Sequence, residues 1–237
     1  MHGLQHPKLT ASLNNLGAAL IETGNYAQAI SCLSSAFQHS KTALEIRTGI
    51  GQRIGERYHP AACIIDIWMM RDTTTDEKRP QLQYCEFVYT HPMKVPTQAT
   101  SPSEISVAVA IAFNLAVAHH LASLQGCTGA HSFQGNSKEE LLRQALRHYQ
   151  HAFRLQRTQA RTSQSPFFFM ACINNIGVVF DNLGEKHQSE ECFTHLLSLL
   201  MYISSTGSVE PSRFEFFFTN TTSRLTSDVC GFGAAAA

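Results

Sequence analysis

The sequence predicts an all-α protein, a helical solenoid with an inserted β-hairpin. Three observations support this prediction. A pattern of large, small and aromatic residues recurs three times, and each copy has apolar residues at helical spacing. The stretch between the first two copies is instead rich in β-branched and aromatic residues. Because such a helical unit cannot bury its apolar face alone, the copies are expected to stack on one another.

The first copy spans residues 1–47 and should contain two helices, 7–23 and 26–46, joined at Gly24. Gly17 and Ala29 are expected to be small because the axes of two packed helices approach to about 8–10 Å. Apolar residues three or four positions apart should share one packed face of the first helix. These residues are Leu9, Leu13, Leu16 and Leu20.

Residues 48–104 interrupt the repeat pattern and form a predicted insertion. Cys63–Met70 and Leu82–Thr90 have strand-like composition and flank a polar segment, which predicts two strands of an antiparallel hairpin. Pro92, Pro96 and Pro102 then mark a loop before helix resumes.

The second copy, residues 105–161, has a glycine-rich loop at 126–136 in place of a short turn. Its helices are expected at 105–124 and from Lys138 to about Arg161, with Asn136 or Ser137 as the N-cap of the latter. Acidic residues in the first turn of that helix favour its dipole.

The third copy, residues 165–204, should contain helices at 167–183 and 186–204. A last helix within 208–228 has phenylalanines at helical spacing and is expected to cover the open end of the stack. The tail, 229–237, is expected to be disordered.

The three copies place the same residue types at the same offsets, and this pattern resembles the tetratricopeptide repeat. The resemblance implies a binding surface and no catalysis, with the first helix of each repeat lining a concave groove. The first copy contributes Leu13, Leu16, Gly17, Leu20, Gly24, Tyr26, Ala29, Leu33 and Ala36. The split second copy contributes Ala112, Leu115, Ala116, His119, Ala145, Tyr149 and Ala152, and the third contributes Ile173, Ile176, Gly177, Phe180, Gly184, Ser189 and Phe193.

The start of the chain is more narrowly similar to the repeats of kinesin light chains and related adaptors. Those repeats open with Gly, His and Pro ahead of Leu-Asn-Asn-Leu, as Gly3, His6 and Pro7 precede residues 13–16 here. The similarity ends where the insertion begins, which argues against a continuous cargo groove. The interrupted arrangement also resembles uncharacterised algal tetratricopeptide-like proteins.

An asparagine recurs at one motif position, as Asn15, Asn114 and Asn175, and two copies carry a second, Asn14 and Asn174. A buried primary amide is costly unless its donor and its acceptor both find partners. Two interpretations are open. In the first, the amides fix repeat stacking by bonding the backbone of the next repeat; in the second, they line the groove and bond the backbone of an extended peptide.

The other predicted groove positions form an apolar floor, Ala18, Val117 and Val178, with His120 and Asn182 one turn further along. Repeat domains of this family that hold acidic chaperone tails use a clamp of lysines and arginine at these helices, because a desolvated carboxylate needs charge-assisted bonds. Such cations are absent from the matching positions here. The chaperone-tail role is therefore disfavoured.

Composition narrows the range of partners. The 18 basic and 18 acidic residues cancel, so no basic field exists to attract nucleic acid. The longest uninterrupted apolar stretch, Pro166–Ile173, is short, and we expect no membrane insertion. Seven scattered cysteines without metal or redox spacing predict reduced thiols and a cytoplasmic location. No cofactor and no metal are expected.

We therefore predict a non-catalytic interaction scaffold or adaptor that binds a partner's peptide segment, at Asn14, Asn15, Ala18, Asn114, Val117, His120, Asn174, Asn175, Val178 and Asn182. Two alternatives stay open. The first is self-assembly, with the insertion occupying the groove. The second is a hydrolase or metalloenzyme using His120 and cysteines such as Cys172. His148 and His151 are three positions apart on one helix and could bind one metal, but the repeat pattern is expected to turn them outward, and no third ligand lies at an obvious spacing.

Overall fold

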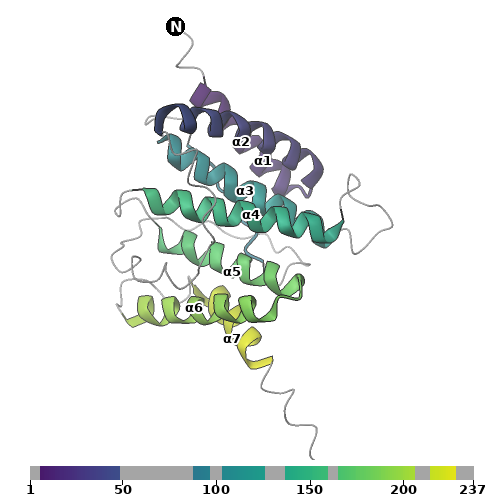
Figure 1. Cartoon of the computed structure of the whole chain (residues 1–237), viewed down its shortest axis with the longest axis vertical. Helices are drawn as coiled ribbons and strands as arrows, with labels where there is room; N and C mark the ends of the chain where they lie inside the picture. The colour runs from purple at the N-terminus through teal and green to yellow at the C-terminus, as the bar shows by residue number, and fades with distance from the viewer. Residues whose placement is uncertain are drawn as a thin grey trace, which may run out of the picture. The chain divides into compact units, whose positions relative to one another are not determined.

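The computed structural model describes residues 6–48, 88–96, 103–125, 137–159, 165–205 and 214–227. This described part is all-helical, with seven helices and no strand (Figure 1). It forms two compact bodies: α1 to α4 with residues 90–96, and α5 to α7 with residues 88–89. The predicted hairpin is not supported, because residues 88–90 form no strand and the rest of its two strands lies outside the described residues.

The first body begins with a pair of helices, α1 (His6–Glu22) and α2 (Tyr26–Thr48), which lie side by side (Figure 1). Gly24 makes the turn between them at a φ of 76°, a left-handed conformation that suits glycine. Gly17 faces α2 so closely that an added Cβ would overlap the side chain of Leu33. The predicted reason for a small residue at this position is therefore confirmed.

The prediction of which α1 side chains are buried is wrong in part. Leu9 and Leu16 are 51% and 53% exposed, and Leu13 and Leu20 are only half-buried. The side chains of α1 that are buried lie on a neighbouring stripe, which faces α2 and α3. That stripe includes Ala11, Asn14, Ala18 and Ile21. Helical spacing identifies an apolar face, but only a neighbouring element can bury it.

The next helix, α3 (Glu104–Gln125), is the central element of the first body. It contacts α1, α2 and α4, and every residue from Val107 to Ser123 is buried. By length and composition α3 is apolar enough to cross a membrane, but 89% of its most apolar window is buried within the protein. The core helix of a soluble protein passes the same test, so this is weak evidence for a membrane span.

The last helix of the first body, α4 (Lys138–Thr158), buries only one face against α3. Ser137 is its N-cap, and the Ser137 hydroxyl accepts a hydrogen bond of 3.1 Å from the backbone N–H of Glu140. Glu139 and Glu140 supply negative charge to the first turn, where the helix dipole favours it.

The second body contains α5 (Pro166–Asn182), α6 (Lys186–Ser205) and α7 (Glu215–Ser227), and α6 contacts both of the others. Its first two helices are joined and packed in the same way as α1 and α2. Gly184 turns the chain at a φ of 77°, and a Cβ at Gly177 would lie 3.1 Å from the Phe193 ring. Buried Ser189, which replaces the usual alanine, donates a 3.0 Å hydrogen bond to the Gly177 carbonyl.

Candidate functional site

In the first body, the extended residues 90–96 are held by asparagines of α1 and α3. Asn15 bonds both backbone groups of Val95: the Val95 N–H donates to Asn15 Oδ1 at 2.8 Å, and Asn15 Nδ2 donates to the Val95 carbonyl at 2.7 Å. Asn114 bonds Met93 in the same two ways, at 2.7 and 2.8 Å. Each amide therefore uses its donor and its acceptor on one residue.

The geometry of extended backbone explains why asparagine suits this position. In an extended chain the N–H and C=O of one residue point to the same side, and those of the next residue point away. A primary amide carries one acceptor and one donor group side by side, so it can pair with both. Met93 and Val95 are two residues apart, and their backbone groups thus face the same edge of the segment.

Asn14 completes this network and links the two helices. Its Nδ2 donates to the Met93 carbonyl at 2.9 Å, and its Oδ1 accepts from Asn114 Nδ2 at 2.9 Å. Asn14 and Asn114 are both fully buried. Both interpretations of the asparagines therefore apply to this network. The bond between Asn14 and Asn114 joins adjacent repeats, and both amides also hold an extended backbone.

Side chains of the segment add a second kind of contact. Val95 is buried in an apolar cluster with Ala11, Ala36 and residues of α3, and Met93 packs against the edge of that cluster. Lys94, between them, points to solvent and forms an exposed ion pair with Glu22, with 2.8 Å between Nζ and Oε1. Apolar and charged side chains thus alternate, as in a strand with one buried face.

In the second body, Asn175 bonds both backbone groups of Tyr89. The Tyr89 N–H donates to Asn175 Oδ1 at 2.8 Å, and Asn175 Nδ2 donates to the Tyr89 carbonyl at 2.9 Å. The Tyr89 ring packs among Phe167, Phe216 and Phe217, with centroid separations of 5.3, 6.3 and 5.9 Å. Each body therefore holds its own part of residues 88–96 through the asparagine at the same motif position.

The remaining predicted site residues do not join these contacts in the described part of the chain. Ala18, Val117 and Val178 are almost fully buried, at 0, 0 and 2% exposure, so they offer no open floor. Asn182 is exposed and donates to the Val178 carbonyl of its own helix at 2.9 Å. His120 is fully buried, with its Nδ1 3.5 Å from the hydroxyl of Tyr149.

Asn174, also predicted, is fully buried and has other partners. Its Nδ2 donates to Asn175 Oδ1 at 3.0 Å, and its Oδ1 accepts a hydrogen bond from Asn220 of α7. It therefore fastens α7 within the second body.

Sequence reasoning missed the segment itself. The prolines at 92 and 96 were interpreted as a loop signal, yet residues before proline are restricted to extended conformations. His91 and Val95 both precede a proline, and the apolar residues Met93 and Val95 stand two positions apart with Lys94 between them. Together these features indicate an extended piece with one apolar face.

The buried histidines and thiols bear on the catalytic alternative. Burial lowers the pKa of His120 to about 3, with a smaller contribution from Lys138, and burial raises the pKa of the Cys172 thiol well above its ordinary value. A thiol that stays protonated is a poor nucleophile. No group of three or more His, Cys, Asp or Glu side chains able to hold a metal lies among the described residues.

His148 and His151 were expected to point outward, and this is wrong. Both rings pack edge-on against Phe37 of α2 with centroid separations of 5.3 Å, and His148 also stacks on His119. Burial, with neighbouring His119, His151 and Arg147, lowers the pKa of His148 to about 3. These histidines belong to the packing between helices.

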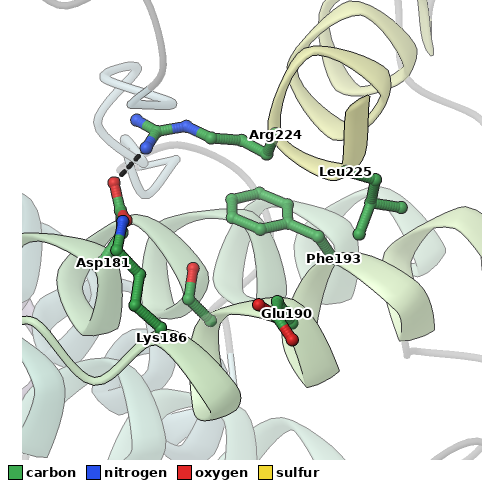
Figure 2. A pocket seen from close by; sticks show the side chains of 7 residues that line it. Asp181, Lys186, Glu190, Phe193, Arg224 and Leu225 are labelled. Carbon is green, nitrogen blue, oxygen red and sulfur yellow. Dashed lines mark hydrogen bonds and ion pairs between the residues drawn. The ribbon is translucent and has the colours of Figure 1, made fainter. Parts of the chain in front are cut away.

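A small hollow in the second body lies where α5, α6 and α7 meet. Figure 2 shows Arg224 of α7 reaching Asp181 at the end of α5, with Phe193 and Leu225 beside them. Asp181 also pairs with Lys186, and although burial alone would raise the pKa of Asp181, these two cations outweigh it and lower that pKa. Asp181 is thus paired with both Lys186 and Arg224, and the pair with Arg224 ties α7 to α5.

Comparison with known proteins gives one match. Residues 9–47 match the family model described as tetratricopeptide repeat. This segment is a tetratricopeptide repeat. It corresponds to α1 and α2, and a tetratricopeptide repeat is typical of scaffolds for protein–protein interaction. No curated protein and no solved structure matched the chain, so the similarity to kinesin light chains and to algal proteins stays a prediction.

Proposed function

We propose that this chain is a non-catalytic interaction scaffold or adaptor that holds a partner's peptide segment in extended conformation. The site in the first body is the face of α1 and α3 that carries Asn14, Asn15 and Asn114. The observation that supports it is the paired bonding of Val95 by Asn15 and of Met93 by Asn114. These contacts use only backbone groups, which any extended peptide presents.

The amides are suited to bind a peptide because the protein holds their side chains in a fixed orientation. Asn14 and Asn114 fix each other's orientation through their mutual bond. A ligand that brings its own N–H and C=O satisfies polar groups that would be costly to bury unpaired. A peptide could therefore gain affinity from main-chain bonds and specificity from the side chains between them.

The proposal can be tested by selecting peptides from a displayed random library on the full chain. We expect Asn15→Ala to weaken binding of the selected peptides by about tenfold, the value of one or two lost hydrogen bonds. Asn182→Ala is the matched control, because that exposed amide bonds only its own helix in the structure. Equal binding by both variants and the wild type, all folded by circular dichroism, would contradict the site.

The same proposal extends to compartment and chemistry. Cys32, Cys172 and Cys192 are free thiols in the described part of the chain, which supports a reducing, cytoplasmic location. We propose that the partner is a protein and not a nucleic acid, because the chain's charges balance.

Self-association is a second candidate. Two observations favour it: residues 90–96 already occupy the asparagines, and Leu9 and Leu16 expose apolar surface on α1. Multi-angle light scattering of the full chain, with Leu9→Ser, Leu16→Ser as the comparison, tests this candidate. A concentration-dependent dimer lost in that variant would support it, and a strict monomer at high concentration would remove it.

A further inference from the structure

We propose that residues 90–96 are a built-in competitor for the partner peptide and that the partner carries the same side-chain pattern. That pattern is two apolar residues two positions apart, a basic residue between them and a proline directly after the second. The inference rests on the proposed function and specifies which peptide the site would take.

The backbone contacts indicate that the segment behaves as a ligand would. Residues 90–96 belong to no helix, and the N–H and C=O groups of Met93 and Val95 bond Asn114 of α3 and Asn15 of α1, with the Lys94–Glu22 ion pair beside them. The same four backbone groups are present in a separate peptide of extended conformation. A peptide in trans can therefore replace the segment bond for bond.

The side chains define the pattern. Val95 is 6% exposed and lies in the cluster with Ala11, Ala36, Val107 and Ile111, which requires a small apolar residue. Met93 packs at the margin of that cluster and can be a larger apolar residue.

The residues around Val95 refine the pattern further. Lys94 faces Glu22, so a basic residue is favoured at that position, although an exposed pair contributes little energy. Pro96 restricts Val95 to the extended conformation that Asn15 recognises.

Covalent attachment makes the segment a strong competitor even if each contact is weak. A tethered ligand has an effective concentration on the order of 1 mM. For a free peptide that would bind the open site at about 1 μM, this competition weakens the apparent affinity about 1000-fold. A partner must therefore bind better than the segment does, or the segment must first be displaced.

The experiment measures fluorescence anisotropy of a labelled peptide with the sequence of residues 90–96, titrated with the full chain. The receptor variant is Met93→Asp, Val95→Asp, which puts two carboxylates where apolar side chains are buried and so releases the segment. We expect the peptide to bind this variant at least tenfold more tightly than the wild type. A folded variant that binds the peptide no better than the wild type would overturn the inference.

Control peptides test each part of the pattern. N-methylation at the Met93 and Val95 positions removes the two N–H donors to Asn114 and Asn15 and should weaken binding by tenfold or more. Replacing lysine by glutamate at the position of Lys94 should weaken it about twofold to fivefold, in the range of an exposed ion pair. The receptor change Glu22→Lys should then reverse that preference.

Loss of helix in the released variant is also a decisive outcome. In that case the wild-type peptide, added in trans, should restore helix content by circular dichroism, and the N-methylated peptide should not. Absence of restoration would overturn the inference. A milder variant, Met93→Pro, removes the N–H that donates to Asn114 and shortens the apolar side chain but introduces no charge, so it should give a smaller gain in peptide binding.

Failure of this inference can be distinguished from failure of the proposed function. If library-selected peptides of another pattern bind the chain and lose affinity with Asn15→Ala, the scaffold role stands and the pattern is wrong. If neither those peptides nor the 90–96 peptide bind the released variant, both proposals fail.

Discussion

The repeats α1–α2 and α5–α6 place the same motif in two different surroundings. Gly17 corresponds to Gly177 and Gly24 to Gly184, and both turns use nearly the same positive φ, 76° and 77°. Their outer faces differ: Leu16 is 53% exposed, whereas its counterpart Ile176 is fully buried. The motif thus determines how two helices pack on each other, but neighbouring elements determine what else is buried.

Asparagines at equivalent positions of the two repeats also bond different neighbours. Asn14 and Asn174 stand at one motif position and are both fully buried. Each donates to Oδ1 of the asparagine that follows it. Asn14 also bonds Met93 of the extended segment and Asn114 of α3, whereas Asn174 also bonds Asn220 of α7. One residue type at one position therefore serves peptide-like binding in the first body and helix docking in the second.

The two bodies should respond differently to acid, and this is the largest expected effect. Burial, with Arg147 nearby and Glu140 opposing it, lowers the pKa of His119 to about 4, and burial lowers the pKa values of His120 and His148 to about 3. In the unfolded chain each pKa is about 6.5, so below that pH the unfolded state takes up protons that the folded state does not. Stability is full above about pH 6.5 and falls as pH drops toward the folded pKa values, by about 2 kcal/mol per histidine at pH 5.

The second body should keep its stability over that range. The pKa of Asp181 is lowered by Lys186 and Arg224, so the stability from its ion pairs is present above the unfolded value of about 3.9 and is lost only at lower pH. Hydrogen exchange resolved by peptide, at pH-corrected rates between pH 7.5 and 5, measures the two bodies separately. His148→Gln should reduce the acid sensitivity of α3 and α4, while His187→Gln, an exposed site on α6, should not. Equal acid sensitivity of both bodies would contradict the histidine assignment.

Alanine in place of Asn14 and of Asn174 should destabilise different parts of the protein. Asn14→Ala removes donors and acceptors from the buried network and should cost about 1–3 kcal/mol, with faster hydrogen exchange in residues 90–96. Asn174→Ala should cost a similar amount but release α7 instead, because Asn220 loses its bond to that amide. Loss of protection in the same segment for both variants would show that the two positions have one role.

The described part also shows what can be predicted from sequence and what cannot. The helix pairs follow from local information, since glycine turns and apolar spacing specify them without reference to distant residues. The recurrence of Asn15, Asn114 and Asn175 identified groups that bond extended backbone. Their occupant was not predictable, because Val95 is 80 positions from Asn15 and nothing in its own sequence neighbourhood reports that contact.

The two repeats should differ in how well they tolerate a larger residue where their paired helices approach closely. Alanine at Gly17 would overlap the buried Leu33 side chain, and such overpacking costs about 1–3 kcal/mol, partly offset by about 1 kcal/mol of helix propensity. At Gly177 the nearest atoms are 3.1 Å away, so the two terms should nearly cancel. Urea unfolding followed by hydrogen exchange should show a net loss of about 1–2 kcal/mol for Gly17→Ala only. In a double-mutant cycle, Leu33→Ala should cost less in the Gly17→Ala background, and additive costs would contradict the overlap.

The smallest expected effect comes from the residue that breaks the motif. Ser189 stands where α2 has Ala29, and its buried hydroxyl donates to the Gly177 carbonyl at 3.0 Å, a bond between α5 and α6 that an alanine at this position cannot form. Ser189→Ala should cost about 0.5–1.5 kcal/mol, the net value of one neutral hydrogen bond, and the loss should appear as faster exchange in α6. The matched control is Ser198→Ala in the same helix, where the exposed hydroxyl bonds only its own helix at Thr194. If Ser189→Ala is neutral, the serine adds nothing to the packing of α5 on α6 that the alanine of the motif would not provide.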